Sequence, residues 1–243
     1  MQEPILHYYN KYGVDINRIE EIVYGDKYLA VLLKDGSIGV CATLLGNVKT
    51  TLTELDNFDV TSYAHRIFAI AYFNALLNNK ADYSKQVDIF NKIDFRKYSN
   101  IVMIGFFGSL AEKFKRSSID LSIFDFKSKN PDLVDMKRQK EYLAKADFVI
   151  LTSTSIINNT FLDIVNSTSH NCRIATLGPS TILDADMFQY KNVHLLFGSL
   201  FEKNDLNLLN IIRNDGGTKS FLHLINKVCF ENQKNEEIKP TIN

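Results

Sequence analysis

The sequence has no excess charge of either sign: among its 243 residues, 28 are Lys or Arg and 28 are Asp or Glu. Proteins that bind nucleic acids usually carry a basic excess that pairs with phosphates, so no nucleic-acid partner is expected. No apolar run approaches the roughly 18 residues of a membrane-spanning helix. The N-terminus also shows no basic segment followed by an apolar stretch, which is the pattern of a signal peptide. We therefore expect a cytoplasmic protein with no membrane partner.

Cysteine and paired histidine are also scarce. The three cysteines, Cys41, Cys172 and Cys229, are an odd number at wide spacings, which argues against a disulfide framework and fits a reducing compartment. No C-x-x-C pair occurs, and no two of the five histidines lie four positions apart. His170 lies two positions before Cys172, but loop and core positions explain this pair more simply than a metal does. The sequence therefore predicts no metal site made by side chains alone.

What is present is the material of an ordinary folded domain, with 45% hydrophobic and 23% charged residues. The first hundred residues favour a small α+β unit. We expect a helix from Pro4 to Gly13 and, over Val60–Asn78, a helix with one apolar face. The expected strands are Ile19–Tyr24, Tyr28–Leu33 and Ser37–Thr43, the last two joined by an Asp-Gly hairpin turn. Three strands followed by a helix predict a small sheet covered on one side.

From Asn100 onward, short apolar runs alternate with helical patterns. The expected strands are Ile101–Ile104, Leu121–Phe126, Phe148–Leu151, Arg173–Leu177 and Val193–Phe197. The expected helices are 110–116, 136–145, 160–166 and 184–190. Continuous apolar strands between helices indicate a mainly parallel sheet covered on both faces, which predicts an α/β, Rossmann-like domain of about five strands.

These patterns predict three segments. Residues 1–95 would form the small α+β domain and residues 96–230 the Rossmann-like domain, with the boundary in the polar stretch before Asn100. Residues 231–243 are polar and charged, and we expect this tail to be disordered.

In an open parallel sheet, ligands bind beyond the carboxyl ends of the strands. The first such end here is Gly105-Phe106-Phe107-Gly108-Ser109, which resembles a phosphate-binding turn at the start of a helix. Asp125 follows Gly105 by 20 positions, where dinucleotide folds often place a ribose-binding acid. The G-x-G-x-x-G fingerprint is absent, however, so a nicotinamide cofactor is not the expected ligand. In the alternative interpretation, the two phenylalanines plug the crevice or line a small-ligand pocket.

Two further strand ends are rich in hydroxyl groups. Thr152 to Thr160 includes four successive hydroxylated residues and two asparagines, Asn158 and Asn159. One asparagine could cap the helix that starts near Thr160, but capping leaves the hydroxyls unexplained, and these could bind an anionic ligand. Gly178-Pro179-Ser180-Thr181 ends another strand, and Ser180 or Thr181 could equally cap a following helix.

Residues for acid–base catalysis are few. Asp125, Asp184, Asp186 and Asp215 are the charged candidates, and neither paired carboxylates nor a His–Asp arrangement stands out. No G-x-S-x-G nucleophile elbow is present. The catalytic residues therefore stay unassigned, and the sequence leaves open whether the protein is an enzyme.

Several of these motifs resemble one known family. The run from Ala146 to Thr160 looks like its Asp-led strand, its Thr-Gly turn and its Asn-x-Thr motif. Leu177 to Thr181 is similar to its Gly-Pro-Ser-Thr-Pro-Leu signature, and Ala71 to Ala75 resembles its Ala-x-x-Asn-Ala helix. The family is that of the putative heavy-metal chelation proteins, a group of unknown function. Its members are similar to an enolase N-terminal-like domain joined to a Rossmann-like domain.

The resemblance implies a pocket between the two domains, lined by Asn158, Thr160, Gly178, Pro179 and Ser180, with Gly105 and Phe106 matching a further glycine loop. The chain also departs from the family pattern. Ser153 replaces the glycine of the Thr-Gly turn, Ile182 stands where proline is frequent, and Phe106 occupies a place where members often carry histidine. Loss of that histidine weakens a direct metal role.

Together, these arguments predict a small-molecule site at the interdomain cleft that binds or processes an anionic or metal-chelating metabolite. The expected ligand-binding residues are Gly105, Phe106, Asp125, Thr152, Ser153, Thr154, Asn158, Thr160, Gly178, Pro179, Ser180 and Thr181. The cofactor is unknown, and any metal would arrive already chelated by a small molecule. A nucleotide- or dinucleotide-dependent enzyme and a non-enzymatic scaffold are the alternatives. A homodimer is expected, although the sequence does not show its interface.

Overall fold

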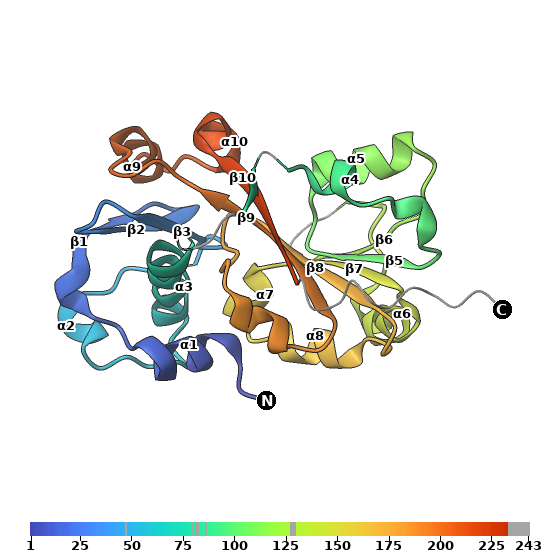
Figure 1. The fold of residues 1–243 in the computed structure, drawn as a ribbon, viewed down its shortest axis with the longest axis horizontal. Helices are drawn as coiled ribbons and strands as arrows, with labels where there is room; N and C mark the ends of the chain where they lie inside the picture. Colours follow the sequence, from blue (N-terminus) through green and yellow to red (C-terminus); the bar gives the residue numbers. More distant parts are fainter. Residues whose placement is uncertain (47, 79, 81–82, 86, 127–129, 233–243) are drawn as a thin grey trace.

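Two β-sheets organise the chain in a computed structural model that describes residues 1–46, 48–78, 80, 83–85, 87–126 and 130–232 (Figure 1). The smaller sheet has the order β1-β2-β3 and the larger has the order β4-β10-β9-β8-β7-β5-β6. The predicted α/β class, with a mainly parallel sheet preceded by a small α+β unit, is confirmed. The tail that we expected to be disordered begins at residue 231, and its residues 233–243 lie outside the described ranges.

The small sheet consists of β1 (Ile19–Tyr24), β2 (Tyr28–Leu33) and β3 (Ile38–Ala42), all antiparallel. Local chemistry explains its hairpin, because Asp35 Oδ1 accepts a 2.9 Å hydrogen bond from Ser37 N–H across the predicted Asp-Gly turn. Helix α1 (Pro4–Tyr12) precedes the sheet, and a short 3-10 turn, η1 (Ile16–Arg18), leads into β1.

The prediction that this sheet is covered on one side is wrong. Its residues Leu29, Val31 and Cys41 pack toward α3 (Tyr63–Leu77), whereas Ala30 and its neighbours on the opposite face pack against α9 (Leu206–Arg213) and α10 (Thr218–Phe221). Figure 1 shows α3 on one side of the sheet, and α9 and α10 on the other. The all-apolar strand β2 is accordingly buried along its whole length.

Helix α3 also differs from the amphipathic helix that its spacing predicted. Twelve of its fifteen residues are buried, so it is a central helix rather than one with a single apolar face. It packs against the small sheet on one side and approaches α1 and α7 (Thr154–Ile157) on others. A short helix, α2 (Leu52–Leu55), lies in the segment before it.

The larger sheet has a parallel part with the order β6-β5-β7-β8-β9. These strands are β5 (Ile101–Ile104), β6 (Ser122–Phe124), β7 (Phe148–Thr152), β8 (Arg173–Leu177) and β9 (Val193–Leu200). In chain order this is 2-1-3-4-5, the flavodoxin-like form of the doubly wound fold, whose switch point lies between its first and third strands. Here those strands are β5 and β7.

Two strands beyond the expected five extend this sheet. The antiparallel strand β10 (Asn226–Glu231) pairs with β9, and the two-residue strand β4 (Ser84–Lys85) pairs with β10. β4 comes from the first hundred residues, and α9 and α10 come from the second half but cover the small sheet. The chain therefore passes three times between the two parts, before β4, after β9 and before β10, and their division at residue 95 stays a prediction.

Helices cover both faces of the larger sheet, as expected. On one face lie α4 (Ile89–Lys92), the 3-10 turn η2 (Phe95–Lys97) and α5 (Gly108–Arg116). On the other lie α6 (Gln139–Lys145), entered through η3 (Met136–Arg138), with α7 and α8 (Phe161–Ser167). Within the described ranges, no helix combines the length and the apolar character that crossing a bilayer requires.

Four local predictions need correction. The segment expected to be an α-helix at 184–190 is the 3-10 helix η4 (Ala185–Gln189), capped by Asp184, and a similar turn η5 (Leu222–Leu224) follows α10. Neither Ser180 nor Thr181 caps a helix, because no helix begins directly after them. The predicted loop after β7 contains α7, and the residue at the N-cap of α8 is Thr160 rather than an asparagine.

Gly39 in β3 allows the closest approach of the small sheet to α3. A Cβ atom built on Gly39 would lie 2.1 Å from Ala71 O and 2.2 Å from Ala75 N, both backbone atoms of α3. Backbone atoms cannot move aside as a side-chain end can, so any side chain at this position forces the helix away from the sheet.

We therefore expect Gly39→Ala to destabilise the fold by about 3 kcal/mol or more, at the upper end of overpacking effects. Urea unfolding followed by circular dichroism measures this change. Gly108→Ala is the matched control, because its added Cβ would come no closer than 3.4 Å to the ring of Phe106. Equal stability of the two variants would contradict the close packing.

Candidate functional site

Two neighbouring cavities open at the carboxyl ends of β5 and β7, the switch point of the sheet. The first cavity has a volume of about 300 Å³ and the second about 240 Å³. Phe107, Thr152 and Thr154 line both, so the two cavities share a wall. A sheet of this order leaves a crevice at this point because the crossover connections run in opposite directions from it.

The first cavity lies between the small sheet and the larger one. Tyr28 of β2 and Ala42 of β3 form one wall, and Gly178-Pro179-Ser180 after β8 forms another. Thr218 of α10 closes a third side, and its Oγ1 atom lies 2.7 Å from the hydroxyl of Tyr28. Ser180 Oγ accepts a 3.0 Å hydrogen bond from Ala42 N–H, which ties the two walls together at the cavity.

Charge in the first cavity is mainly positive. Lys113 of α5 and Lys227 of β10 line it together with Asp88, and Lys113 Nζ lies 2.9 Å from Asp88 Oδ2. Burial raises the pKa of Asp88, but hydrogen bonds from Lys113 and Phe90 N–H outweigh it and hold this pKa below its usual range. Asp88 is therefore a fixed carboxylate rather than a proton acceptor at neutral pH. Burial also raises the pKa of Tyr28, so its phenol stays protonated.

The N-terminus of α5 faces the same region. Ser109 and Leu110, in its first turn, line the first cavity, and the residue at its N-cap, Phe107, makes no side-chain capping hydrogen bond. The first N–H groups of a helix have no partner inside the helix and favour an anion. The cavity thus combines a helix start without a side-chain cap, hydroxyl groups and two lysines, and of the two first-turn residues Leu110 already donates its N–H to Phe107 O at 2.9 Å.

The second cavity is more apolar. Its apolar lining consists of four phenylalanines, one methionine and two aliphatic side chains: Phe106, Phe107, Phe124, Phe126, Met136, Leu44 and Ile104. The polar residues that line only this cavity are Asp125, Gln139, Ser155, Asn158 and Thr160. Asp125 Oδ2 accepts a 2.8 Å hydrogen bond from Phe106 N–H, which holds the Gly105-Phe106 loop against the end of β6. Gly105 has φ = 90°, a conformation that favours glycine.

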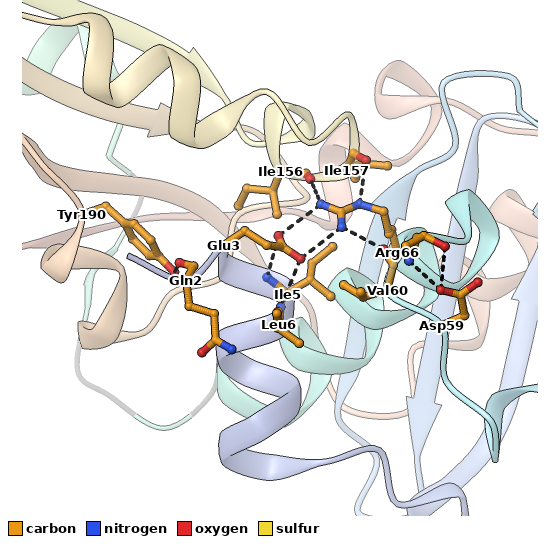
Figure 2. Close-up of polar contacts among 11 residues, drawn as sticks. Gln2, Glu3, Ile5, Leu6, Asp59, Val60, Arg66, Ile156, Ile157 and Tyr190 are labelled. Carbon is orange, nitrogen blue, oxygen red and sulfur yellow. Dashed lines mark hydrogen bonds and ion pairs between the residues drawn. The ribbon is translucent and has the colours of Figure 1, made fainter.

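A buried guanidinium positions the helix that carries the shared wall. Arg66 of α3 is 6% exposed, and all five of its N–H groups donate hydrogen bonds (Figure 2). Two go to the Glu3 carboxylate at 3.0 and 3.1 Å, two to the carbonyl oxygens of Ile156 and Ile157 at 2.5 and 2.9 Å, and one to Val60 O. Arg66 therefore holds the last two residues of α7.

The structure divides the residues that the sequence singled out between the two cavities. Ser153, Gly178, Pro179 and Ser180 line the first cavity; Gly105, Phe106, Asp125, Asn158 and Thr160 line the second; Thr152 and Thr154 line both. Thr181 lies behind the wall, because its hydroxyl bonds Phe197 O at 2.9 Å and Ser153 Oγ at 2.5 Å. Phe106 lines the second cavity and Phe107 lines both, so their positions fit the alternative in which the two phenylalanines line a small-ligand pocket.

The other acidic candidates have structural partners. Asp184 caps η4 and accepts a hydrogen bond from Tyr8, and Asp186 pairs with His7 and Lys11 of α1 at 2.7 and 2.6 Å. Asp215 accepts a 2.7 Å hydrogen bond from Asp26 N–H. These contacts fix helices and turns to one another, and none of the three carboxylates is among the described lining residues of either cavity.

Sequence reasoning missed several lining residues. Tyr28, Lys113 and Thr218 face the first cavity, and Ser155 and Gln139 face the second. Tyr28 lies in an apolar strand, and Lys113 lies among the other charges of an amphipathic helix, so neither carried a local signal. Only Ser155, which lies within the noted hydroxyl run, belonged to a motif that the sequence analysis singled out.

The fold and the crevice at its switch point define a doubly wound α/β protein with a small antiparallel sheet attached. The chain belongs to the DUF364 family, described as "putative heavy-metal chelation", whose sequence profile matches residues 88–230. A second profile with the same description, DUF4213, matches residues 9–77. The predicted family is therefore confirmed.

Solved structures support the fold. A DUF364 protein of unknown function from Desulfitobacterium hafniense DCB-2 is 18% identical, with a TM-score of 0.73 over 94% of this chain and 98% of that one. A DUF364 protein of unknown function from Pyrococcus horikoshii is 20% identical, with a TM-score of 0.76 over 88% of this chain and 93% of that one. No curated protein matches the chain.

The donor atoms of the cavities do not fit a heavy-metal ion bound directly. Soft metals prefer thiolate and imidazole ligands, but neither cavity has a cysteine or histidine among its described lining residues. The residues that the structure describes also include no group of three or more His, Cys, Asp or Glu side chains that could ligate a metal ion. All three cysteines are buried, and burial raises the pKa of Cys172 and of Cys229 to about 12.

Arg66→Met should destabilise the protein by about 3–5 kcal/mol, because it removes the charged partner of the partly buried Glu3 carboxylate and one donor from each of three carbonyl groups. A double-mutant cycle with Glu3→Gln in urea unfolding measures the coupling. The control is Arg18→Met, whose ion pair with Asp15 is largely exposed and should contribute less than about 1 kcal/mol. Additive losses for Arg66 and Glu3 would contradict the network.

The thiols should be inert in the folded protein. With pKa values near 12, the thiolate fraction of Cys172 and Cys229 is about a thousandfold below that of a free cysteine. Titration with a chromogenic disulfide reagent should detect almost no rapid reaction in the native protein and three thiols in guanidinium chloride. One stoichiometric fast thiol in the native state would refute this expectation.

Proposed function

We propose that the first cavity binds a small anionic metabolite that carries carboxylate or phosphate groups, including one that already holds a chelated metal ion. The observation that carries this proposal is the convergence of Lys113, Lys227 and the uncapped start of α5 on one cavity lined by hydroxyl groups. Charge-assisted hydrogen bonds from such donors are the usual way that proteins hold these anions.

The position of the cavity supports binding between the predicted domains. Tyr28 and Ala42 come from the small sheet, and Ser180 bridges to that sheet through Ala42 N–H. A ligand in this cavity would therefore contact both parts of the chain and stabilise their association by mass action. The expected residues Thr152, Ser153, Thr154, Gly178 and Pro179 supply the wall opposite the small sheet.

The charge pattern favours binding over proton transfer. Asp88 is ion-paired and its pKa is lowered, whereas Tyr28 keeps its proton, so neither side chain is poised to exchange a proton near neutral pH. A metal carried into this cavity would keep the ligands of its chelator, because the wall offers hydroxyl and ammonium groups rather than soft donors. This agrees with the description of the family while assigning the chelation to the metabolite.

A nucleotide- or dinucleotide-dependent enzyme stays the alternative, since α5 starts at the classical phosphate position of a doubly wound fold. Asp125, the expected ribose-binding acid, instead accepts the N–H of Phe106 with one carboxylate oxygen. Titration with nicotinamide cofactors, adenine nucleotides and S-adenosylmethionine separates this alternative from the proposal.

Lys113→Ala should weaken binding of inorganic phosphate and citrate by about tenfold or more, because it removes one charge-assisted donor from the cavity wall. Isothermal titration calorimetry at two salt concentrations measures the loss. Lys115→Ala is the matched control, since Lys115 lies on the same helix and is exposed. The Lys115→Ala variant should bind phosphate and citrate as tightly as the wild-type protein does.

If inorganic phosphate, citrate and a panel of metal chelates neither bind nor raise the melting temperature of the wild-type protein, the proposed function is refuted. Equal affinities of the Lys113 and Lys115 variants would place the anion elsewhere.

A further inference from the structure

Two residues that line the second cavity each carry a buried polar atom with no hydrogen-bond partner within the described part of the chain. These atoms are Ser155 Oγ and Gln139 Nε2. Ser155 is only 2% exposed, and both residues line the cavity. Nearly all buried polar groups in folded proteins are hydrogen-bonded, so two unpaired ones on one cavity wall call for an explanation.

The local structure of α7 does not explain them. A serine inside a helix usually relieves its hydroxyl by bonding a carbonyl oxygen one turn earlier, and Ser155 does not. Its own carbonyl is occupied, because Ser155 O accepts the N–H of Thr160 at 2.9 Å and the hydroxyl of Thr160 at 3.3 Å. Arg66 binds the backbone carbonyls of the two following residues, so the backbone of α7 next to Ser155 is held in place and only the Ser155 side chain itself can rotate.

The rest of the wall indicates the kind of ligand. Phe106, Phe107, Phe124 and Phe126 give the cavity flat apolar surfaces, and Asp125 is the only charged residue among the described lining. Asp125 already accepts a hydrogen bond from Phe106 N–H. A cavity of this kind penalises a charged ligand and favours a flat, uncharged one.

Its size narrows the choice. At about 240 Å³, the second cavity is smaller than the roughly 300–1,000 Å³ of sites for drug-sized ligands, so it suits one ring system. Gln139 Nε2 can only donate a hydrogen bond, whereas Ser155 Oγ can donate or accept. The complementary group is therefore a ring with an acceptor atom and a second polar edge.

We infer that the second cavity binds an uncharged nitrogen heterocycle, such as a purine base. The amide of Gln139 donates to a ring nitrogen or carbonyl oxygen, Ser155 bonds the second polar edge, and the phenylalanines pack on the ring faces. This ligand class and this cavity differ from those of the proposed function. The shared wall at Phe107, Thr152 and Thr154 places the ring next to the anion site.

The test uses hypoxanthine, inosine and inosine monophosphate as probes of the full-length protein, followed by saturation-transfer NMR and calorimetry. Ser155→Ala should weaken hypoxanthine binding by about tenfold, which corresponds to about 1.4 kcal/mol. Gln139→Leu, of similar volume, should have a comparable effect. Ser109→Ala, which removes a hydroxyl from the first cavity, is the matched control and should leave hypoxanthine binding unchanged.

A second readout separates a ligand-binding hydroxyl from a structural one. Removal of an unpaired buried hydroxyl relieves its desolvation, so ligand-free Ser155→Ala should melt at the wild-type temperature or about 2 °C higher. If the hydroxyl had a structural role, its removal would instead lower the melting temperature. The predicted signature is thus weaker binding without loss of stability.

Three outcomes would overturn the inference: no binding of any probe at millimolar concentration, unchanged hypoxanthine affinity in both variants, or a clear loss of stability in Ser155→Ala. The first would mean that water alone satisfies the two atoms. The proposed function is tested separately, by comparing phosphate binding to the wild-type protein and to the Lys113→Ala variant. Much tighter binding of the nucleotide than of hypoxanthine and phosphate alone would support one ligand across both cavities, whereas equal affinity for base and nucleotide would support a free base.

Discussion

The buried guanidinium of Arg66 is the interaction on which the arrangement of this protein depends. It joins Glu3 at the start of α1, Val60 before α3 and the end of α7 in one set of five hydrogen bonds. Glu3 also accepts the N–H groups of Ile5 and Leu6, so the same carboxylate starts α1. A charge removed from water is tolerated only when every donor is satisfied. This requirement locks the first hundred residues to the helix that follows β7.

That constraint reaches the cavities because α7 starts at the shared wall. Thr154 is its first residue and lines both cavities, whereas Ser155 faces only the second. The switch point of the sheet therefore divides into two chemically different compartments. One is lined by lysines and hydroxyl groups and suits an anion, and the other is lined by phenylalanines with two unpaired polar atoms and suits a neutral ring. Among their described lining residues, neither has the cysteine or histidine side chains that a bare heavy-metal ion prefers.

Sequence patterns predicted the strands of both sheets well where the signal was local. Apolar runs that end in glycine or hydroxylated residues located β5, β7 and β8 within a residue, and the Asp-Gly turn located the β2–β3 hairpin. The patterns did not predict packing between elements that lie far apart in the sequence. The second cover of the small sheet comes from α9 and α10, and β10 reaches the larger sheet as an antiparallel edge strand. The hydroxyl-rich loops that the sequence singled out lie at the two cavities, but spacing along the chain could not assign each hydroxyl to a cavity or, as for Thr181, to the packing behind one.

The sequence by itself determined the class of the fold, the order of its elements, the family and the absence of a cysteine or histidine metal motif, because each depends on residue type and short spacing. Only the tertiary structure decided that the candidate residues line two cavities rather than one, and that Tyr28, Lys113 and Gln139 belong to them. It also decided which polar atoms remain unpaired. These outcomes depend on contacts between residues far apart in the chain, and such contacts exist only once the sheets and helices have packed together.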